Sequence, residues 1–110
     1  MSCVHRVALA VCAIMSVAGA KSAAAHTYVV TIEQMRFDPP TVTVHSGDTV
    51  VWVNKDLVAH TVSGDAKRFD SGSIASEASW RSVVSEPGRY PYTCLFHPTM
   101  HGTLIVERTP

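Results

Sequence analysis

The most informative stretch of the chain is residues 89–100, which read Arg89-Tyr90-Pro91-Tyr92-Thr93-Cys94-Leu95-Phe96-His97-Pro98-Thr99-Met100. Side chains alternate along a strand, so Tyr90, Tyr92 and Cys94 share one face. This row predicts a strand that faces a core, with Cys94 at the rim. Beyond it a thiol, an imidazole and a thioether recur at three-residue intervals, as Cys94, His97 and Met100. A bent loop can turn all three toward one point.

Other short runs rich in β-branched and aromatic residues precede and follow this stretch, with turn residues between them. They are residues 28–32, 41–44, 49–53, 80–84 and 102–106. This spacing predicts an all-β chain folded as an antiparallel sandwich or barrel. The run 50–53 is apolar at every position, so we expect it to be covered on both faces. Pro91 cannot donate to a strand ladder, and its nitrogen is expected to face an edge or solvent.

The first 25 residues have the order of a secretory signal peptide: Arg6, then an apolar stretch over 7–20, then alanines at 23–25. The apolar stretch is too short for a membrane-spanning helix, and stable membrane insertion is not expected. We therefore interpret residues 1–25 as a cleaved leader and residues 26–110 as the mature domain, in the periplasm or secreted. Cleavage after Ala25 is favoured over cleavage after Ala20.

Loss of the leader removes Arg6 and Lys21 but no acidic residue, so 7 basic residues remain against 9 acidic ones and the formal charge is −2. A nucleic-acid-binding domain would carry a strongly basic patch, which is lacking in this sequence. The leader also contains Cys3 and Cys12, so the mature domain keeps only Cys94. A lone thiol in an oxidising compartment is a liability unless it is buried, reactive or bound to a metal.

A metal offers the simplest use for Cys94, because His97 and Met100 follow at matching offsets. A second imidazole is expected from His60, which follows a predicted strand and the turn-like residues 54–56. Two imidazoles, one thiolate and a weak axial thioether form the type 1 (blue) copper site. Such a site changes little between Cu(I) and Cu(II), which favours electron transfer over catalysis.

Several segments in the order found here resemble the cupredoxins, most closely the amicyanin and plastocyanin branch. They are Met35-Arg36-Phe37, Gly47-Asp48-Thr49-Val50, Trp52-Val53-Asn54, His60-Thr61-Val62, and the stretch from Gly88 through Cys94 to Met100. The short spacing from cysteine to methionine is similar to that of amicyanin, since plastocyanins use a longer loop.

The resemblance implies a Greek-key antiparallel β-sandwich with one copper under the loops at one end. It implies that His97 reaches the surface through an apolar patch of Leu95, Phe96 and Pro98, where a redox partner protein docks transiently. A monomer is expected. Thr61 stands where relatives usually carry asparagine, so the tether between the two ligand loops is expected to differ. Phe96 replaces a proline of amicyanins, which adds a backbone N–H that could reach the sulfur.

Parts of the sequence are also compatible with three other functions. Cys94 and His97 could act as nucleophile and base, although 85 residues leave little room for a substrate cleft. Cleavage after Ala25 would make His26 the amino terminus, where a histidine can chelate copper in oxidative enzymes. A copper store would favour methionine-rich or paired-cysteine sites, but the mature domain has only Met35 and Met100. His45 and His101 are interpreted as surface residues.

Overall fold

The computed structural model describes residues 24–109 of the chain. Most of the predicted leader, residues 1–23, lies outside the described residues, so the structure does not bear on it. Within residues 24–109, no helix has the length and apolar character needed to span a bilayer. The described chain contains eight strands and one short 3₁₀ helix, η1 (Asp65–Lys67).

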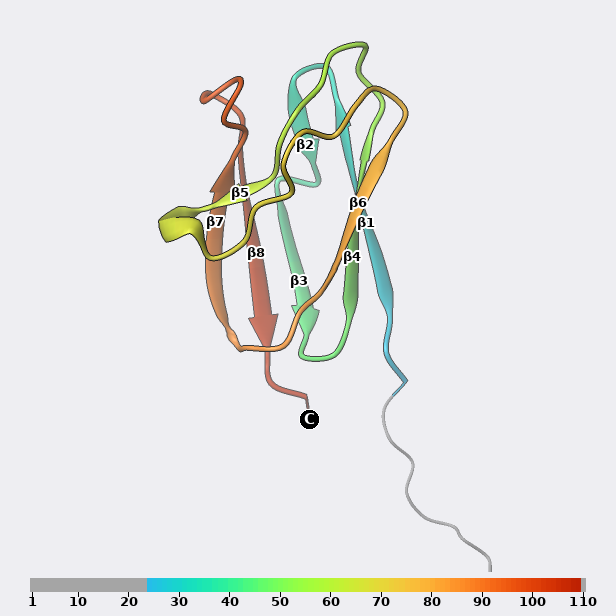
Figure 1. The fold of residues 1–110 in the computed structure, drawn as a ribbon. Coiled ribbons are helices and arrows are strands. Elements are labelled where there is room, and N and C mark those ends of the chain that lie inside the picture. The colour runs from blue at the N-terminus through green and yellow to red at the C-terminus, as the bar shows by residue number, and fades with distance from the viewer. Residues whose placement is uncertain (1–23, 110) are drawn as a thin grey trace, which may run out of the picture.

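The strands form two four-stranded sheets that pack face to face (Figure 1). One sheet has the order β2-β1-β4-β6. Its strands are β1 (Thr27–Glu33), β2 (Arg36–Asp38), β4 (Thr49–Asn54) and β6 (Ser79–Val83). The other has the order β3-β8-β7-β5. Its strands are β3 (Thr41–His45), β5 (Ser63–Gly64), β7 (Gly88–Thr93) and β8 (His101–Glu107).

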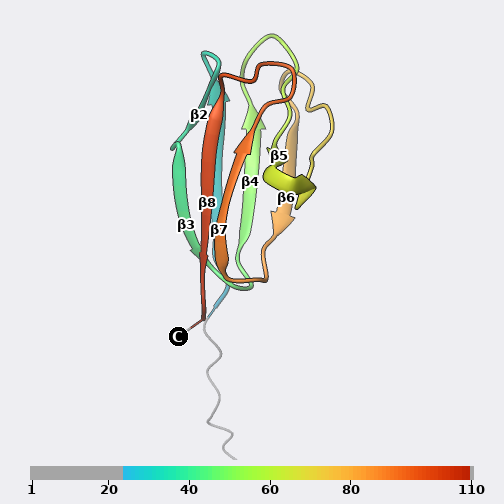
Figure 2. The same cartoon turned by 90° about the vertical axis from the view of Figure 1, so that its left-hand side faces the viewer.

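The predicted β-sandwich is confirmed, but its sheets are mixed rather than purely antiparallel. Strand β1 runs parallel to β4, and β3 runs parallel to β8, while the other neighbours are antiparallel. Parallel neighbours need a crossover connection. Here the chain crosses between the sheets before it returns, since β3 of one sheet lies in sequence between β1 and β4 of the other. Figure 2, turned by 90°, looks onto the sheet that contains β3, β8 and β7, with the other sheet behind it.

The core lies between the sheets and is built from alternate residues of each strand. Strand β8 alternates exposed or half-buried with buried positions, and so does β4. The expectation that the run 50–53 is covered on both faces was wrong for Val51 and Val53, which are half-buried because no layer covers the outer face of their sheet. Pro91 pairs with β8 alone, since β5 reaches only Tyr92 and Thr93.

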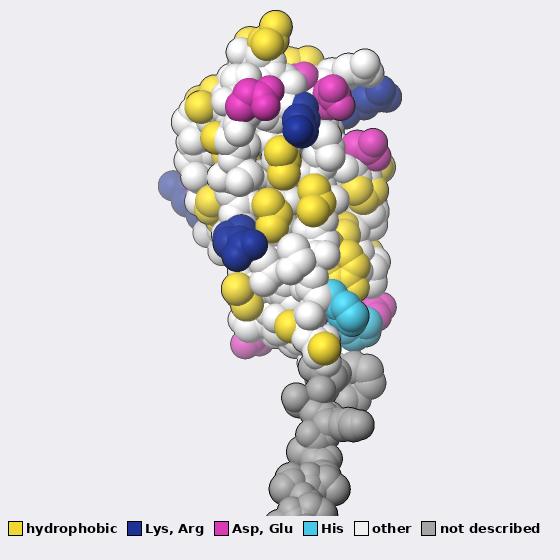
Figure 3. Space-filling view, turned by 90° about the vertical axis from the view of Figure 1, so that its right-hand side faces the viewer, with side chains coloured by type: hydrophobic (Ala, Val, Ile, Leu, Met, Phe, Trp, Pro, Cys, Tyr) yellow, Lys and Arg dark blue, Asp and Glu magenta, His cyan; other side chains and the backbone are white. Residues whose placement is uncertain are grey.

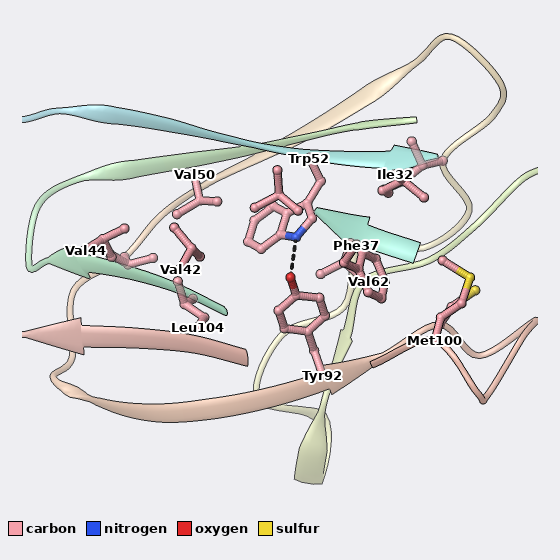
Figure 4. Packing of buried hydrophobic residues seen from close by; sticks show 14 of the residues in the cluster. Ile32, Phe37, Val42, Val44, Val50, Trp52, Val62, Tyr92, Met100 and Leu104 are labelled. Atoms are coloured by element: carbon pink, nitrogen blue, oxygen red, sulfur yellow. Dashed lines mark hydrogen bonds between the residues drawn. The ribbon is translucent and has the colours of Figure 1, made fainter. Parts of the chain in front are cut away.

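An aromatic pair links the two sheets at the centre of the core (Figure 4). The indole Nε1 of Trp52, on β4, donates to the hydroxyl of Tyr92, on β7, at 3.1 Å. The ring of Tyr92 also lies edge-on to Phe37, with centroids 4.8 Å apart. Burial raises the pKa of Tyr92 to about 12. Since Tyr92 comes two residues before Cys94, this packing fixes the strand that leads into the cysteine.

Candidate metal centre

The loops at the upper end of the sandwich in Figure 1 bring His60, Cys94 and His97 together. Their ligand atoms all lie within 4.8 Å of one another. The Sγ of Cys94 is 3.7 Å from Nδ1 of His60 and 3.7 Å from Nδ1 of His97. His60 and Cys94 are fully buried and His97 is half-buried. Within residues 24–109 this is the one group of three or more potential metal-binding histidine, cysteine or acidic side chains.

Two consecutive turns shape the segment from Cys94 to Met100. The N–H of His97 donates to the carbonyl of Cys94 at 3.2 Å, and the N–H of Met100 donates to the carbonyl of His97 at 2.9 Å. Pro98 occupies the second position of the latter turn, where its fixed φ is favoured. The N–H of Cys94 then closes the loop on the carbonyl of Met100 at 3.3 Å.

These turns keep Met100 in the core while the middle of the loop is exposed. Met100 is buried, and Figure 4 shows its side chain at the same end of the core as Ile32 and opposite Val44. All four residues that the sequence nominated as ligands therefore lie at one end of the sandwich.

The loop that carries His60 is organised by Asn54, which ends β4 and is fully buried. Its side-chain amide donates to the carbonyls of Val58 and Ile74, and its oxygen accepts the N–H of Asp56 at 2.9 Å. The predicted turn role of Asn54 is confirmed. The backbone of His60 both donates to and accepts from the backbone of Ile74. These two hydrogen bonds fix the position of the main chain that carries the His60 ring.

Asp56 is a functional residue that the sequence analysis missed. Its Oδ2 lies 2.7 Å from Nε2 of His60, and its carboxylate also accepts the backbone N–H groups of Gln34 and Met35. Burial opposes ionisation of Asp56, but the hydrogen bonds from Met35, His60 and Gln34 together hold its pKa below the ordinary value. An ionised carboxylate can only accept a hydrogen bond, so this contact favours the tautomer of His60 with the proton on Nε2 and the lone pair on Nδ1, the ring nitrogen 3.7 Å from Cys94 Sγ.

Thr61 ties the two ligand loops together through its backbone and its hydroxyl. Its N–H donates to the Sγ of Cys94 at 3.3 Å, as expected. Its hydroxyl accepts the N–H of Leu95 at 2.8 Å and pairs with Ser63 at 2.9 Å. The N–H of Phe96, in contrast, makes no hydrogen bond to the sulfur among the described residues, so that expectation was wrong.

The sulfur of Cys94 lies at a distance from both imidazole nitrogens that suits one shared metal ion. A metal bound to an imidazole nitrogen at about 2.0 Å and to a thiolate at about 2.3 Å holds the two atoms about 3.5–3.7 Å apart at angles between the tetrahedral value and 120°. Both Nδ1–Sγ distances are 3.7 Å. Two histidines and a cysteine, with the thioether of Met100 buried at the same end of the sandwich, form a donor set that favours copper.

The geometry of the site also argues against a catalytic cysteine and against a second metal-binding group in residues 24–109. The complete burial of Cys94 excludes a substrate from its sulfur, which argues against a nucleophile. His26, His45 and His101 form no metal-binding group with each other or with acidic residues in the described part of the chain. His101 is exposed at the start of β8. Met100, the residue directly before it, is buried in the core.

Comparison with known proteins agrees with the β-sandwich fold and with the candidate metal centre. A family model for the cupredoxin-like domain matches residues 5–106. The chain is 34% identical over 93 residues to an amicyanin of Paracoccus versutus, covering 76% of this chain and 67% of that protein. It is 32% identical over 104 residues to a plastocyanin of Synechococcus sp., covering 77% of this chain and 76% of that one. Among solved structures, a Cu(I) form of an amicyanin variant superposes with a TM-score of 0.70 at 30% identity, covering 77% of this chain and 86% of the other.

Proposed function

The chain belongs to the cupredoxin-like family, and from this premise we propose that it is a type 1 copper protein that carries single electrons between redox partner proteins. It holds one copper ion per chain. The observation that supports this function is the convergence of two imidazole nitrogens and one thiol sulfur, each nitrogen 3.7 Å from the sulfur, in a largely buried site. Its activity is electron carriage rather than catalysis.

We assign His60, Cys94 and His97 as the residues that would hold the copper ion, with Met100 as a fourth, weaker ligand. Copper held there would supply the chemistry, a change between Cu(I) and Cu(II). The protein contributes rigidity: Asp56 holds the ring of His60, and the N–H of Thr61 donates to the thiolate of Cys94. Ligands that are already held in position need little rearrangement when the charge changes, and this lowers the barrier to electron transfer.

The route for the electron to the surface is the ring of His97, which is half-buried and has no hydrogen-bond partner for Nε2 among the described residues. Its neighbours Leu95 and Phe96 are 60% and 52% exposed, and Pro98 is exposed as well. Leu57, 92% exposed, lies on the loop between β4 and β5 that also carries His60. We propose that redox partners dock on this apolar surface. Contacts for such encounters are small, below about 1,200 Å² in total.

Electron self-exchange between the Cu(I) and Cu(II) forms tests this docking surface without a known partner. Phe96→Glu places a charge beside His97 and should slow self-exchange at least tenfold, as measured from NMR line widths. Val83→Glu is the matched control, because Val83 is 67% exposed but lies at the far end of β6, opposite Thr49. Equal rates in both variants would contradict docking at this end.

Export of the protein is the second part of the proposal. The basic, apolar and small residues of segment 1–25 support a cleaved leader and a location in the periplasm or outside the cell. The mature domain is proposed to work as a monomer. The start of β1 at Thr27, directly after the proposed cleavage point, is compatible with removal of this segment.

Addition of Cu(II) to the purified protein tests the site. An intense blue colour that a reductant bleaches and an oxidant restores is expected, because a thiolate-to-copper transition gives rise to it. The Cys94→Ser variant should lose the colour completely, while it keeps a hydroxyl of similar size. A pale spectrum in the wild type, or a blue Cys94→Ser variant, would contradict the assignment. Colour is the better readout than metal content, since zinc can occupy the same ligands.

A further inference from the structure

At the end of the sandwich opposite the metal centre, a buried carboxylate accepts a hydrogen bond from the backbone N–H of His26. Asp48, in the turn between β3 and β4, is only 3% exposed. Its Oδ1 accepts the backbone N–H of His26 at 2.9 Å, and its Oδ2 accepts that of His45 at 2.8 Å. The carbonyl of His26 in turn accepts the N–H of Thr49 at 2.9 Å. The chain is therefore held by the fold from His26 onward.

The two residues before His26 are not held in this way. Ala24 and Ala25 are exposed and make no hydrogen bond to another described residue. They lie on the rim of a cavity that is also lined by His26, His45 and Asp48. Figure 3 shows histidine side chains gathered at this lower end of the molecule. The boundary between anchored and unanchored chain thus falls at the peptide bond between Ala25 and His26.

Asp48 also lacks a charged partner. Within residues 24–109 the ion pairs are His45 with Glu107 and His60 with Asp56, and neither includes Asp48. A buried carboxylate is costly unless a positive charge or several hydrogen bonds compensate it. Two backbone N–H groups compensate part of this cost, and they hold the pKa of Asp48 below its ordinary value. A positive charge at the nitrogen of His26 would supply the rest.

We propose that the mature chain begins at His26 and that the carboxylate of Asp48 binds the α-ammonium group that cleavage creates there. A leader peptidase hydrolyses the Ala25–His26 bond with one water molecule, so that Ala25 leaves with a carboxylate and the nitrogen of His26 becomes an ammonium. That nitrogen already lies 2.9 Å from Oδ1 of Asp48. The hydrogen bond becomes an ion pair without any movement of the chain.

This proposal rests on the proposed export of the protein and decides between its two cleavage points. Cleavage after Ala20 would leave five extra residues and a neutral amide at His26, and Asp48 would stay without a counter-charge. The ion pair also engages the amine of His26, which a copper-chelating amino-terminal histidine would need to keep free. The other titratable groups around the amine are the imidazoles of His26 and His45 and the carboxylate of Glu107.

Intact mass and amino-terminal sequencing of the protein test the start site. The full chain is expressed with its own leader in a Gram-negative host and recovered from the periplasm. A start at His26 is expected, and a start at Lys21 would overturn the proposal while export itself stands. A chain that stays uncleaved in the cytoplasm would contradict both this inference and the proposed export.

The reactivity of the amine tests the role of Asp48. A nearby carboxylate raises the pKa of an α-amine from its usual value of about 7.7–8.0, and acylation slows about tenfold for each unit. At neutral pH, acetylation of the His26 amine in the mature wild type should be at least tenfold slower than in the Asp48→Asn variant. The free peptide of residues 26–29 is a second reference if that variant does not fold. Equal rates in the wild type and the peptide would overturn the proposal.

Discussion

The hydroxyl of Thr61 gives the sharpest prediction for the metal centre, because it connects the loop of His60 to the loop of Cys94. It accepts the N–H of Leu95 at 2.8 Å. The hydroxyl of Ser63 donates its single proton to Asp70 at 3.1 Å, so Thr61 must donate to Ser63. Thr61→Val keeps the shape of the side chain and removes both hydrogen bonds. At about 1 kcal/mol for each bond, the apo protein should lose about 2 kcal/mol of unfolding free energy.

Urea denaturation of the apo protein, followed by tryptophan fluorescence, measures this loss. Thr61→Ser is the matched control, because it keeps the hydroxyl and loses one methyl group, which is worth about 0.8 kcal/mol when buried. The Val variant should therefore be less stable than the Ser variant by about 1 kcal/mol. If the Val variant is as stable as the Ser variant, the hydroxyl does not hold the loops together and the reasoning fails.

Three other substitutions test the packing of the core and the charge of Asp48. Tyr92→Phe leaves the buried indole N–H of Trp52 without its acceptor and should cost about 1–3 kcal/mol in urea denaturation; Tyr28→Phe, whose hydroxyl binds no described residue, should cost less than half as much, and equal losses would argue against the cross-sheet bond. Gly102→Ala directs a methyl group into the ring of Tyr92 and should cost about 3 kcal/mol or prevent folding; a variant within about 1 kcal/mol of the wild type would show that the ring can move aside. Hydrogen bonds from His26 and His45 lower the pKa of Asp48 from its ordinary 3.8, so the stability it contributes is present in full above that pH and is lost as the pH falls through the lower value of the folded protein. Acid unfolding followed by circular dichroism should therefore depend less steeply on pH below 3.8 in Asp48→Asn, and an unchanged slope would contradict an ionised Asp48.

The long strands were predictable because their residues alternate, whereas the short ones were not. Strands β1, β3, β4, β6, β7 and β8 all fall where the sequence predicts them. Strand β2 has three residues and β5 only two, too few for a periodic pattern. Both depend on a partner strand, β1 for one and β7 for the other. Their pairing is a tertiary effect that no local window contains.

The residues of the candidate site also differ in how well the sequence predicts them. Cys94, His97 and Met100 are close in sequence, so their spacing alone suggested a common centre. His60 lies 34 residues before Cys94 and was nominated from its place after a strand and from the resemblance. The sequence analysis did not identify Asp56 as a partner of His60, although Asp56 lies only four residues before it. A polar residue at that offset is informative only when the loop geometry, set here by Asn54, is known.

The strongest test of the electron-carrier function is anomalous diffraction at the copper absorption edge from crystals of the loaded protein in both oxidation states. We predict one peak for each chain, in contact with Nδ1 of His60, Nδ1 of His97 and Sγ of Cys94, with these three side chains unmoved between Cu(I) and Cu(II). A peak at the His26 and His45 end of the sandwich, or ligands that rearrange when the metal is reduced, would contradict it.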